Sequence, residues 1–232
     1  MEYDLISIGA HPDDVEVGTG GVLIGLNKAG YKTAIVYLTK GEMGTGGTPE
    51  LRHREAQDAA NLIGSDLLQT FDWGDCRLVD NYDHRLNIAT LIRQYKPKII
   101  LAPYPHLGHG RRQSHPDHIA AGEIVINAAN YATLKKLPIE GEPHLVSKVF
   151  HYFLPPKVAP DFVVDITEHF DKWIECLKCH QSQFMNPEKS KDYIWTLENY
   201  ARSFGSQAGC KYGQGFKAVE PIKVADIFDL IK

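Results

Sequence analysis

The sequence predicts an α/β protein: a Rossmann-like, mostly parallel sheet flanked by helices, with an additional strand and helices towards the C-terminus. Two observations carry this prediction. Short apolar runs, such as the one over residues 5–9, alternate with stretches of helical periodicity through the first 134 residues. This alternation is typical of βαβ units with helices on both faces of a parallel sheet. With 232 residues, 43% of them hydrophobic, the chain can bury a sizeable core, and we expect residues 1–232 to form one domain.

The first four strand–helix pairs follow from apolar runs and from residues that end helices. The first helix is expected to end at Gly30 and the second at Gly64, because glycine readily adopts the left-handed conformation that closes a helix. The third ends before Pro97, since a residue that precedes proline disfavours the helical region. The expected strands are residues 3–10, 33–39, 67–71 and 98–103, and the expected helices are residues 18–29, 49–63, 82–95 and 115–134.

The regular alternation stops after Pro138. Strands are expected at 146–154 and 162–166, followed by a helix from about residue 167. One face of this helix is apolar and is expected to pack on the core; it carries Phe170, Trp173, Ile174 and Leu177.

Charge and composition exclude several classes of function. The net charge of −4 gives no general basic surface, so we expect no nucleic-acid partner. No apolar run approaches 18 residues, and the N-terminus lacks a basic region followed by a hydrophobic one. We therefore expect a cytoplasmic protein that does not span a membrane. Four cysteines do not resemble a disulfide framework, and Cys176 and Cys179 are expected to be helix-packing thiols rather than a metal site.

Two polar clusters each follow an apolar run that is expected to be a strand. His11, Asp13 and Asp14 come directly after the first strand. His115, Asp117 and His118 lie about a hundred residues further on, after the strand at 98–103. The carboxyl ends of parallel strands share one edge of a sheet, where ligands bind in such folds. Either motif alone could be a turn with a helix-capping aspartate, but the two together predict a common site.

These residue types suit a catalytic zinc site. Two imidazoles and one carboxylate, from His11, Asp14 and His118, are a common ligand set that leaves one position open. Asp13 would then be free to act as general base on a water molecule. His115 lies one helical turn before His118, so both rings could face the site. Asp117 could hold an imidazole in the required orientation.

The paired motifs resemble those of the LmbE-like, or PIG-L, superfamily of zinc-dependent N-acetylglucosamine deacetylases. Besides residues 10–14 and 115–118, the resemblance includes residues 18–21, 50–52, 54–56 and 96–97. Near the C-terminus, residues 182–184 and 213–216, with Tyr193, Ala201 and Arg202, are most similar to the branch that deacetylates N-acetylglucosaminyl malate in bacillithiol biosynthesis.

The resemblance implies a role for each residue of the two motifs. His11, Asp14 and His118 would bind Zn²⁺, or alternatively Fe²⁺ or Co²⁺. Asp13 would be the general base, and His115, supported by Asp117, would stabilise the oxyanion.

The resemblance also implies substrate contacts and assembly. Arg52 would bind the sugar or the malate carboxylates, and Tyr193 would lie over the reacting carbonyl. The alternative for Arg52 is an exposed helix residue paired with Glu50 or Glu55. A homo-oligomer, trimeric or hexameric, is also implied.

One position departs from the family pattern. Relatives often have an arginine directly before the second motif, and this chain has Ser114 there. Arg111 and Arg112, earlier in a longer loop, are the candidates to replace it in substrate binding. The rival functions are deacetylation of chitooligosaccharides or of another N-acetyl sugar, removal of a different acyl group, and, from a different class, metal-dependent sugar binding without turnover. A nucleotide-binding Rossmann domain is disfavoured, because no GxGxxG motif follows the first strand.

Overall fold

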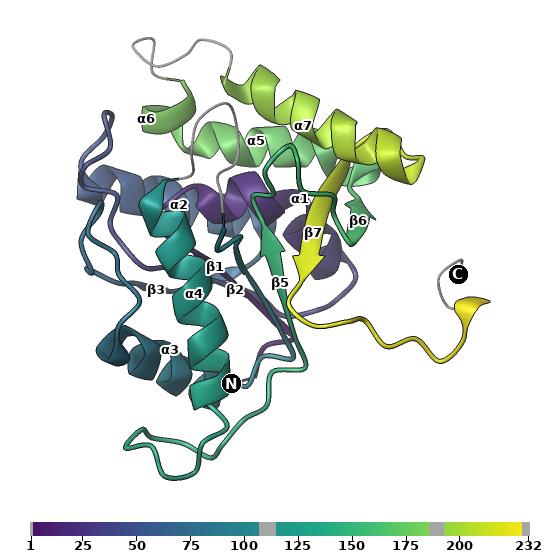
Figure 1. The fold of residues 1–232 in the computed structure, drawn as a ribbon. Helices are drawn as coiled ribbons and strands as arrows, with labels where there is room; N and C mark the ends of the chain where they lie inside the picture. The colour runs from purple at the N-terminus through teal and green to yellow at the C-terminus, as the bar shows by residue number, and fades with distance from the viewer. Residues whose placement is uncertain (1, 107–114, 186–192, 229–232) are drawn as a thin grey trace.

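The protein, described here from a computed structural model that covers residues 2–106, 115–185 and 193–228, is built around a seven-stranded sheet (Figure 1). The strands are β1 (Leu5–Gly9), β2 (Thr33–Tyr37), β3 (Asp66–Thr70), β4 (Ile99–Pro103), β5 (Lys148–Tyr152), β6 (Phe162–Asp165) and β7 (Gly213–Ala218). Their order is β3-β2-β1-β4-β5-β7-β6. The first five strands are parallel, and β7 runs antiparallel to both β5 and β6. The predicted mostly parallel sheet is therefore confirmed.

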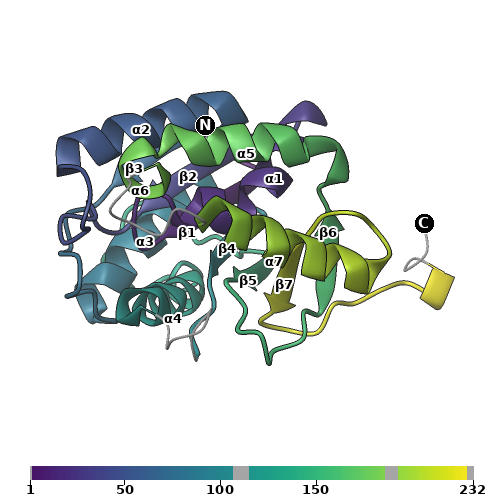
Figure 2. The same cartoon turned by 90° about the horizontal axis from the view of Figure 1, so that it is seen from above.

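Helices cover both faces of this sheet. The larger ones are α1 (Asp14–Lys28), α2 (Pro49–Ile63), α3 (Tyr82–Tyr95), α4 (Pro116–Tyr131), α5 (Phe170–Cys179) and α7 (Tyr193–Ala208). A 3₁₀ turn (Thr167–His169) precedes α5, and the short α6 (Gln181–Phe184) follows it. Figure 2 shows α1, α2 and α5 on one side of the strands and α3 and α4 on the other. Among the described residues, no helix has the length and apolar character needed to cross a membrane.

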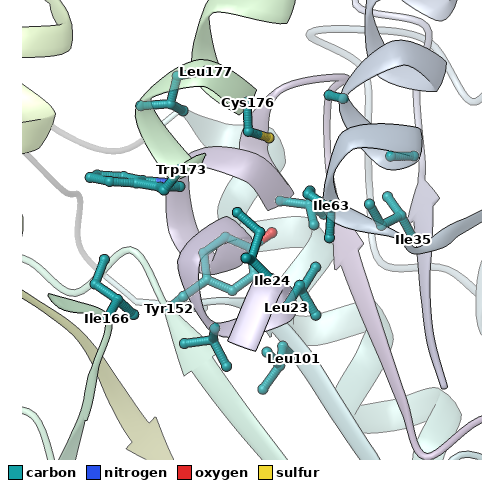
Figure 3. Close-up of a cluster of buried hydrophobic side chains, with 14 of the residues drawn as sticks. Leu23, Ile24, Ile35, Ile63, Leu101, Tyr152, Ile166, Trp173, Cys176 and Leu177 are labelled. Carbon is teal, nitrogen blue, oxygen red and sulfur yellow. The ribbon is translucent and has the colours of Figure 1, made fainter. Parts of the chain in front are cut away.

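Alternate residues of each central strand supply two separate cores. In β1, Leu5 contributes to the core beneath α1, α2 and α5, whereas Ile6 and Ile8 contribute to the core beneath α3 and α4. Burial on both faces explains why the strands are continuous apolar runs. Figure 3 shows the first core, where Trp173 of α5 lies beside α1, and its Nε1 donates to the Glu16 carbonyl at 2.7 Å. The predicted apolar face of this helix is therefore confirmed.

The expected helix at 18–29 begins four residues earlier, at Asp14. The backbone at Asp13 has φ 129°, and the Asp13 carbonyl accepts the first helical hydrogen bond from the Val17 amide. The turn therefore continues directly into α1, and Asp14 is held on this helix rather than on a loop.

The cysteine pair in α5 has a structural place. Cys176 is fully buried in the core, and Cys179 is half-buried. Within the described ranges, the residue groups that could hold a metal ion include neither of them. The expectation that these two thiols pack the helix agrees with this burial.

Candidate metal centre and active site

His11, Asp14 and His118 meet at the carboxyl edge of the sheet. His11 follows β1, Asp14 is the first residue of α1, and His118 lies in the first turn of α4. The Asp14 carboxylate connects the two imidazoles: Oδ2 lies 3.4 Å from His11 Nδ1, and Oδ1 lies 3.0 Å from His118 Nε2. All three side chains are buried, and their ligand atoms lie within 4.8 Å of one another. The structure thus brings together the three predicted metal ligands.

The second nitrogen of His11 is held by two carboxylates. His11 Nε2 lies 3.1 Å from Asp75 Oδ1 and 3.2 Å from Asp117 Oδ2. A metal-binding histidine commonly uses its other ring nitrogen in this way, because the carboxylate fixes the ring orientation and raises the basicity of the ligating nitrogen. Asp75 and Asp117 therefore lie where the supporting residues of a metal centre would be expected.

Asp75 is the residue that the sequence analysis missed. It lies five residues after β3, at the same edge of the sheet as the two motifs, and it is buried. Its Oδ2 accepts a hydrogen bond from the Met43 amide at 3.0 Å, and this contact orients Oδ1 towards His11. The available signal was an acidic residue in the loop after the third parallel strand, where the topology also places ligand-binding groups.

The charges of this cluster reinforce one another. Burial favours neutral imidazole, but hydrogen bonds to Asp117, Asp14 and Asp75 outweigh it and raise the pKa of His11 well above its usual value. Burial likewise opposes ionisation of Asp14, yet the charge of His118 and the hydrogen bond with His11 lower the pKa of Asp14 well below 3.8. Without a metal ion, the ionised carboxylates of the pocket therefore favour a protonated His11, and a cation that binds here would replace this proton.

Asp13 lies beside the ligands without belonging to either group that could hold a metal ion. Its carboxylate Oδ2 is 3.2 Å from Arg52 Nη2, and its side chain is 18% exposed. Burial raises the pKa of Asp13, and the positive charge of Arg52 partly offsets this rise. Asp13 is thus a reachable carboxylate of increased basicity next to the predicted metal ligands.

Arg52 is buried in α2, not exposed, so the alternative pairing with Glu50 or Glu55 is wrong. Its Nη1 donates to the Gly41 carbonyl at 2.7 Å, and its Nη2 donates to the Pro12 carbonyl at 2.6 Å. Gly41 has φ 67°, and a Cβ there would lie 1.9 Å from Arg52 Nη1, so only glycine fits. These contacts place the Arg52 guanidinium beside Asp13; a direct contact with substrate stays a prediction.

His115 caps the N-terminus of α4, where its Nδ1 accepts a hydrogen bond from the Asp117 amide at 3.3 Å. Its ring lies edge-on to His11, with 4.7 Å between the centroids, and its side chain is 37% exposed. Burial and the nearby His11 and His118 lower its pKa. Asp117 Oδ2 is 3.9 Å from His115 Nδ1 but 3.2 Å from His11 Nε2, so its shorter contact is to His11.

The remaining predicted site residues are Tyr193, Arg111 and Arg112. Tyr193 begins α7, is 36% exposed, and stacks on Phe184 with 5.3 Å between the ring centroids. Phe184 ends α6, whose Ser182 hydroxyl donates to Glu55 Oε2 at 2.6 Å. Arg111 and Arg112 lie outside the described residues.

Three known proteins similar to this chain match between 79% and 96% of it. A diacetylchitobiose deacetylase of Thermococcus kodakarensis is 32% identical in an alignment that covers 94% of this chain and 84% of that protein. A probable N-acetyl-alpha-D-glucosaminyl L-malate deacetylase 2 of Bacillus anthracis is 26% identical over 79% of this chain and 82% of that protein. The crystal structure of a conserved protein from Thermus thermophilus superimposes with a TM-score of 0.86 and 34% identity, covering 96% of this chain and 97% of that one.

The similarity also extends to another type of enzyme. A 4-oxalmesaconate hydratase of Pseudomonas putida is 26% identical over 84% of this chain and 76% of that protein. The family model described as PIG-L, GlcNAc-PI de-N-acetylase, matches residues 6–129, a segment that contains both polar motifs. With more than half of its residues matched, the chain belongs to the PIG-L family, in agreement with the resemblance carried by its two motifs.

Proposed function

We propose that this protein is a metal-dependent N-deacetylase of N-acetylglucosamine derivatives. Water is added across the amide bond, the C–N bond breaks, and acetate and a free amine leave. The observation that carries the proposal is a spare carboxylate: Asp13 lies next to a complete set of metal ligands but is not one of them. Asp14, Asp75 and Asp117 already supply three acidic groups, and metal binding alone would not need Asp13 as a fourth. Hydrolysis, in contrast, needs a base.

His11, Asp14 and His118 would hold the metal, and the donor set fits Zn²⁺, with Fe²⁺ or Co²⁺ as alternatives. When bound, the metal would polarise the amide carbonyl and lower the pKa of a water molecule. Asp75 and Asp117 would keep His11 in the orientation required for binding.

Asp13 would take the proton from the attacking water and later deliver it to the leaving nitrogen. Burial raises its pKa, which makes it a stronger base than an exposed aspartate. Arg52 would hold the carboxylate towards the site through the 3.2 Å contact, and its hydrogen bond to the Pro12 carbonyl would fix the turn that carries Asp13.

His115 would stabilise the oxyanion by donating a hydrogen bond. Support comes from its partial exposure and from its ring contact with His11 at the edge of the ligand set. We also propose Tyr193 as a residue over the carbonyl, and Arg52, Arg111 and Arg112 as substrate contacts. The roles of Tyr193 and Arg52 follow from the resemblance to the family, whereas Arg111 and Arg112 are candidates to replace the arginine that relatives have at the position of Ser114.

Two substrates are candidates. N-acetylglucosaminyl malate is supported by the Bacillus relative and by the C-terminal motifs. Diacetylchitobiose is supported by the Thermococcus relative, which is more identical to this chain and covers more of it. The two differ at the aglycone, where the first is anionic and the second is a neutral sugar.

A release assay tests the function and the substrate together. Zinc-loaded protein would be incubated with N-acetylglucosaminyl malate, diacetylchitobiose and N-acetylglucosamine, and both acetate and free amine would be measured. We expect equal amounts of acetate and amine from at least one substrate and from none after metal removal by a chelator. Metal-loaded protein that binds these sugars without releasing amine would contradict the proposal and indicate a binding module. If none of the three sugars is bound or deacetylated, the proposal fails, and hydration of the type named for the Pseudomonas relative becomes the activity to test.

A further inference from the structure

The segment that follows β7, residues 219–228, extends away from the body of the molecule. Figures 1 and 2 show it leaving the sheet in both views. Its base is held to β5, because the Val219 amide donates to the Val149 carbonyl at 3.2 Å. Lys148 Nζ adds a hydrogen bond to the Pro221 carbonyl at 3.0 Å. We refer to residues 219–228 as the arm.

The arm exposes apolar side chains at its far end. Ile227 is 73% exposed and Phe228 is 66% exposed, and Ile222 nearer the base is exposed as well. A short turn presents the end, since the Phe228 amide donates to Asp226 Oδ1 at 2.8 Å. A segment that stays free in water is normally polar or charged, whereas clustered apolar side chains mark a surface that binds another one. The arm therefore has the character of a docking segment.

An apolar cavity of about 310 Å³ lies between α1 and the sheet. It is placed towards the amino ends of the parallel strands, because Leu5 and Ile99, the first residues of β1 and β4, line it. The candidate metal centre lies at the opposite edge of the sheet. Solvent reaches the cavity, since several of its apolar lining residues are only half-buried: Leu26, Ile99, Phe150, Phe162 and Val164.

The size and lining of this cavity favour a few apolar side chains as its occupant. Pockets for small ligands span about 300–1,000 Å³ and orient the ligand with several placed polar groups. This cavity is at the lower limit of that range. Among the described residues that line it, only Asp165 and His169 are polar, and Asp165 Oδ1 already accepts from the Thr167 amide at 2.8 Å. The lining thus complements the side chains that the arm exposes.

We propose that the arm of one copy of this chain inserts Ile227 and Phe228 into the cavity between α1 and the sheet of a second copy. The arm extends away from its own body, so its apolar end meets another molecule rather than its own cavity. Burial of these two side chains supplies the driving force for association. The two surfaces in contact differ, so the copies assemble by reciprocal exchange in a pair or head to tail in a closed ring.

Removing the apolar end of the arm tests the inserting side. Sedimentation equilibrium is expected to show self-association of the wild type and a dissociation constant at least roughly 100-fold higher for Ile227→Ser/Phe228→Ser, because two large apolar side chains are no longer buried. Val79→Ser/Tyr82→Ser, which removes two exposed apolar side chains elsewhere, is the matched control and should associate as the wild type does. The proposal is overturned if the wild type is a monomer, which would leave the cavity to its own arm or to a small apolar molecule. It is also overturned if the arm variant associates normally or the control is weakened equally.

Narrowing the cavity tests the receiving side. Leu26 belongs to the cavity wall on α1 and is half-buried, so Leu26→Trp is expected to fill part of the space and to weaken self-association as the arm variant does. An equimolar mixture of the two variants again contains an intact arm and an intact cavity, on different molecules. We expect the mixture to associate although neither variant does so alone. A mixture that stays monomeric, or normal association of Leu26→Trp, would overturn the proposal. Urea unfolding checks that each variant folds, and if Leu26→Trp does not, the arm variant and its control still decide.

Discussion

At the scale of single residues, backbone strain concentrates around the candidate site. Among the described residues, four that are not glycine have a positive φ, and three of them, Asp13, Cys76 and Phe153, surround the site, with φ values of 129°, 63° and 61°. Cys76 donates its amide to Asp117, and the Phe153 ring stacks on His118 at 5.0 Å. Such conformations cost about 1–3 kcal/mol each, and they persist only where surrounding contacts determine them. The site is therefore held by tertiary contacts and not by local preference.

Replacing His118 tests the ligand assignment. His118→Ala is expected to lower the metal affinity by at least roughly 10-fold, because two ligands cannot hold the ion as three do. The measurement is metal content after dialysis, by mass spectrometry. His53→Ala is the control, since His53 is exposed on α2 and should leave the content unchanged. Full metal retention by His118→Ala would remove it from the ligand set.

Asp75 is expected to act on the metal through His11. Asp75→Ala removes one of the two carboxylates on His11 Nε2 and should weaken binding of the first metal equivalent by roughly 10- to 100-fold. Competition with a chromophoric chelator measures this affinity. Asp72→Ala, which removes an exposed carboxylate paired with Lys40, is expected to bind as the wild type does. Equal affinities for both variants would mean that Asp117 alone orients His11.

At the scale of helices and strands, the sequence predicted best where side chains mark the ends. The helices expected at 49–63 and 82–95 have those bounds, with Thr48 and Asn81 accepting hydrogen bonds at their N-termini and Gly64 closing the first. The polar motifs after β1 and β4 could also be recognised from the local sequence, because each follows an apolar run that is typical of a buried strand. For Asp75 the sequence offered only its place in the loop after β3, because the orientation of its carboxylate depends on a contact with the Met43 amide, which is distant in sequence.

The packing of α1 on β5 depends on a glycine. A Cβ on Gly18 would lie 2.1 Å from the ring of Tyr152, which is fully buried and donates its hydroxyl hydrogen to the Ile8 carbonyl. Because this ring cannot easily move, Gly18→Ala is expected to destabilise the fold by about 1–3 kcal/mol. Urea unfolding gives the free energy.

Gly25→Ala is the matched variant on the same helix. Its Cβ would meet the side chain of His169, which is only half-buried and can turn away, and alanine also favours the helix. We expect a change within about 1 kcal/mol. If both variants unfold at the same urea concentration, close packing at Gly18 does not limit stability.

At the scale of the whole molecule, the strand order explains where the site lies. The chain fills the sheet from β1 to β3 in one direction and then places β4 on the other side of β1 (Figure 1). The helices that follow β1 and β4 pack on opposite faces, so the ends of these two strands form the switch point of the sheet, where ligands bind in such folds. His11 and Asp14 come from one side of this switch point and His118 from the other. The edge of the sheet at which the candidate site lies was therefore predictable from topology alone.

A buried histidine makes the stability of the fold depend on pH. His151 is 3% exposed, and burial lowers its pKa to about 4. Its unfolded value is about 6.5, so the unfolded chain binds the proton more readily, and stability is lost as the pH falls from about 6.5 to 4. The loss from this group is at most about 3 kcal/mol. His151→Gln should show a shallower fall in unfolding free energy over this range; parallel curves for the two proteins would contradict the assignment.

Asp13→Asn tests the central claim most directly, because it removes the basic group of the Asp13 side chain and keeps its size. Wild type and variant would be brought to equal zinc content, and acetate release from the preferred N-acetylglucosamine derivative would be compared. We predict that the variant keeps its zinc and loses roughly 10²- to 10⁴-fold in kcat. Turnover equal to that of the wild type, at equal zinc content, would show that Asp13 is not the base.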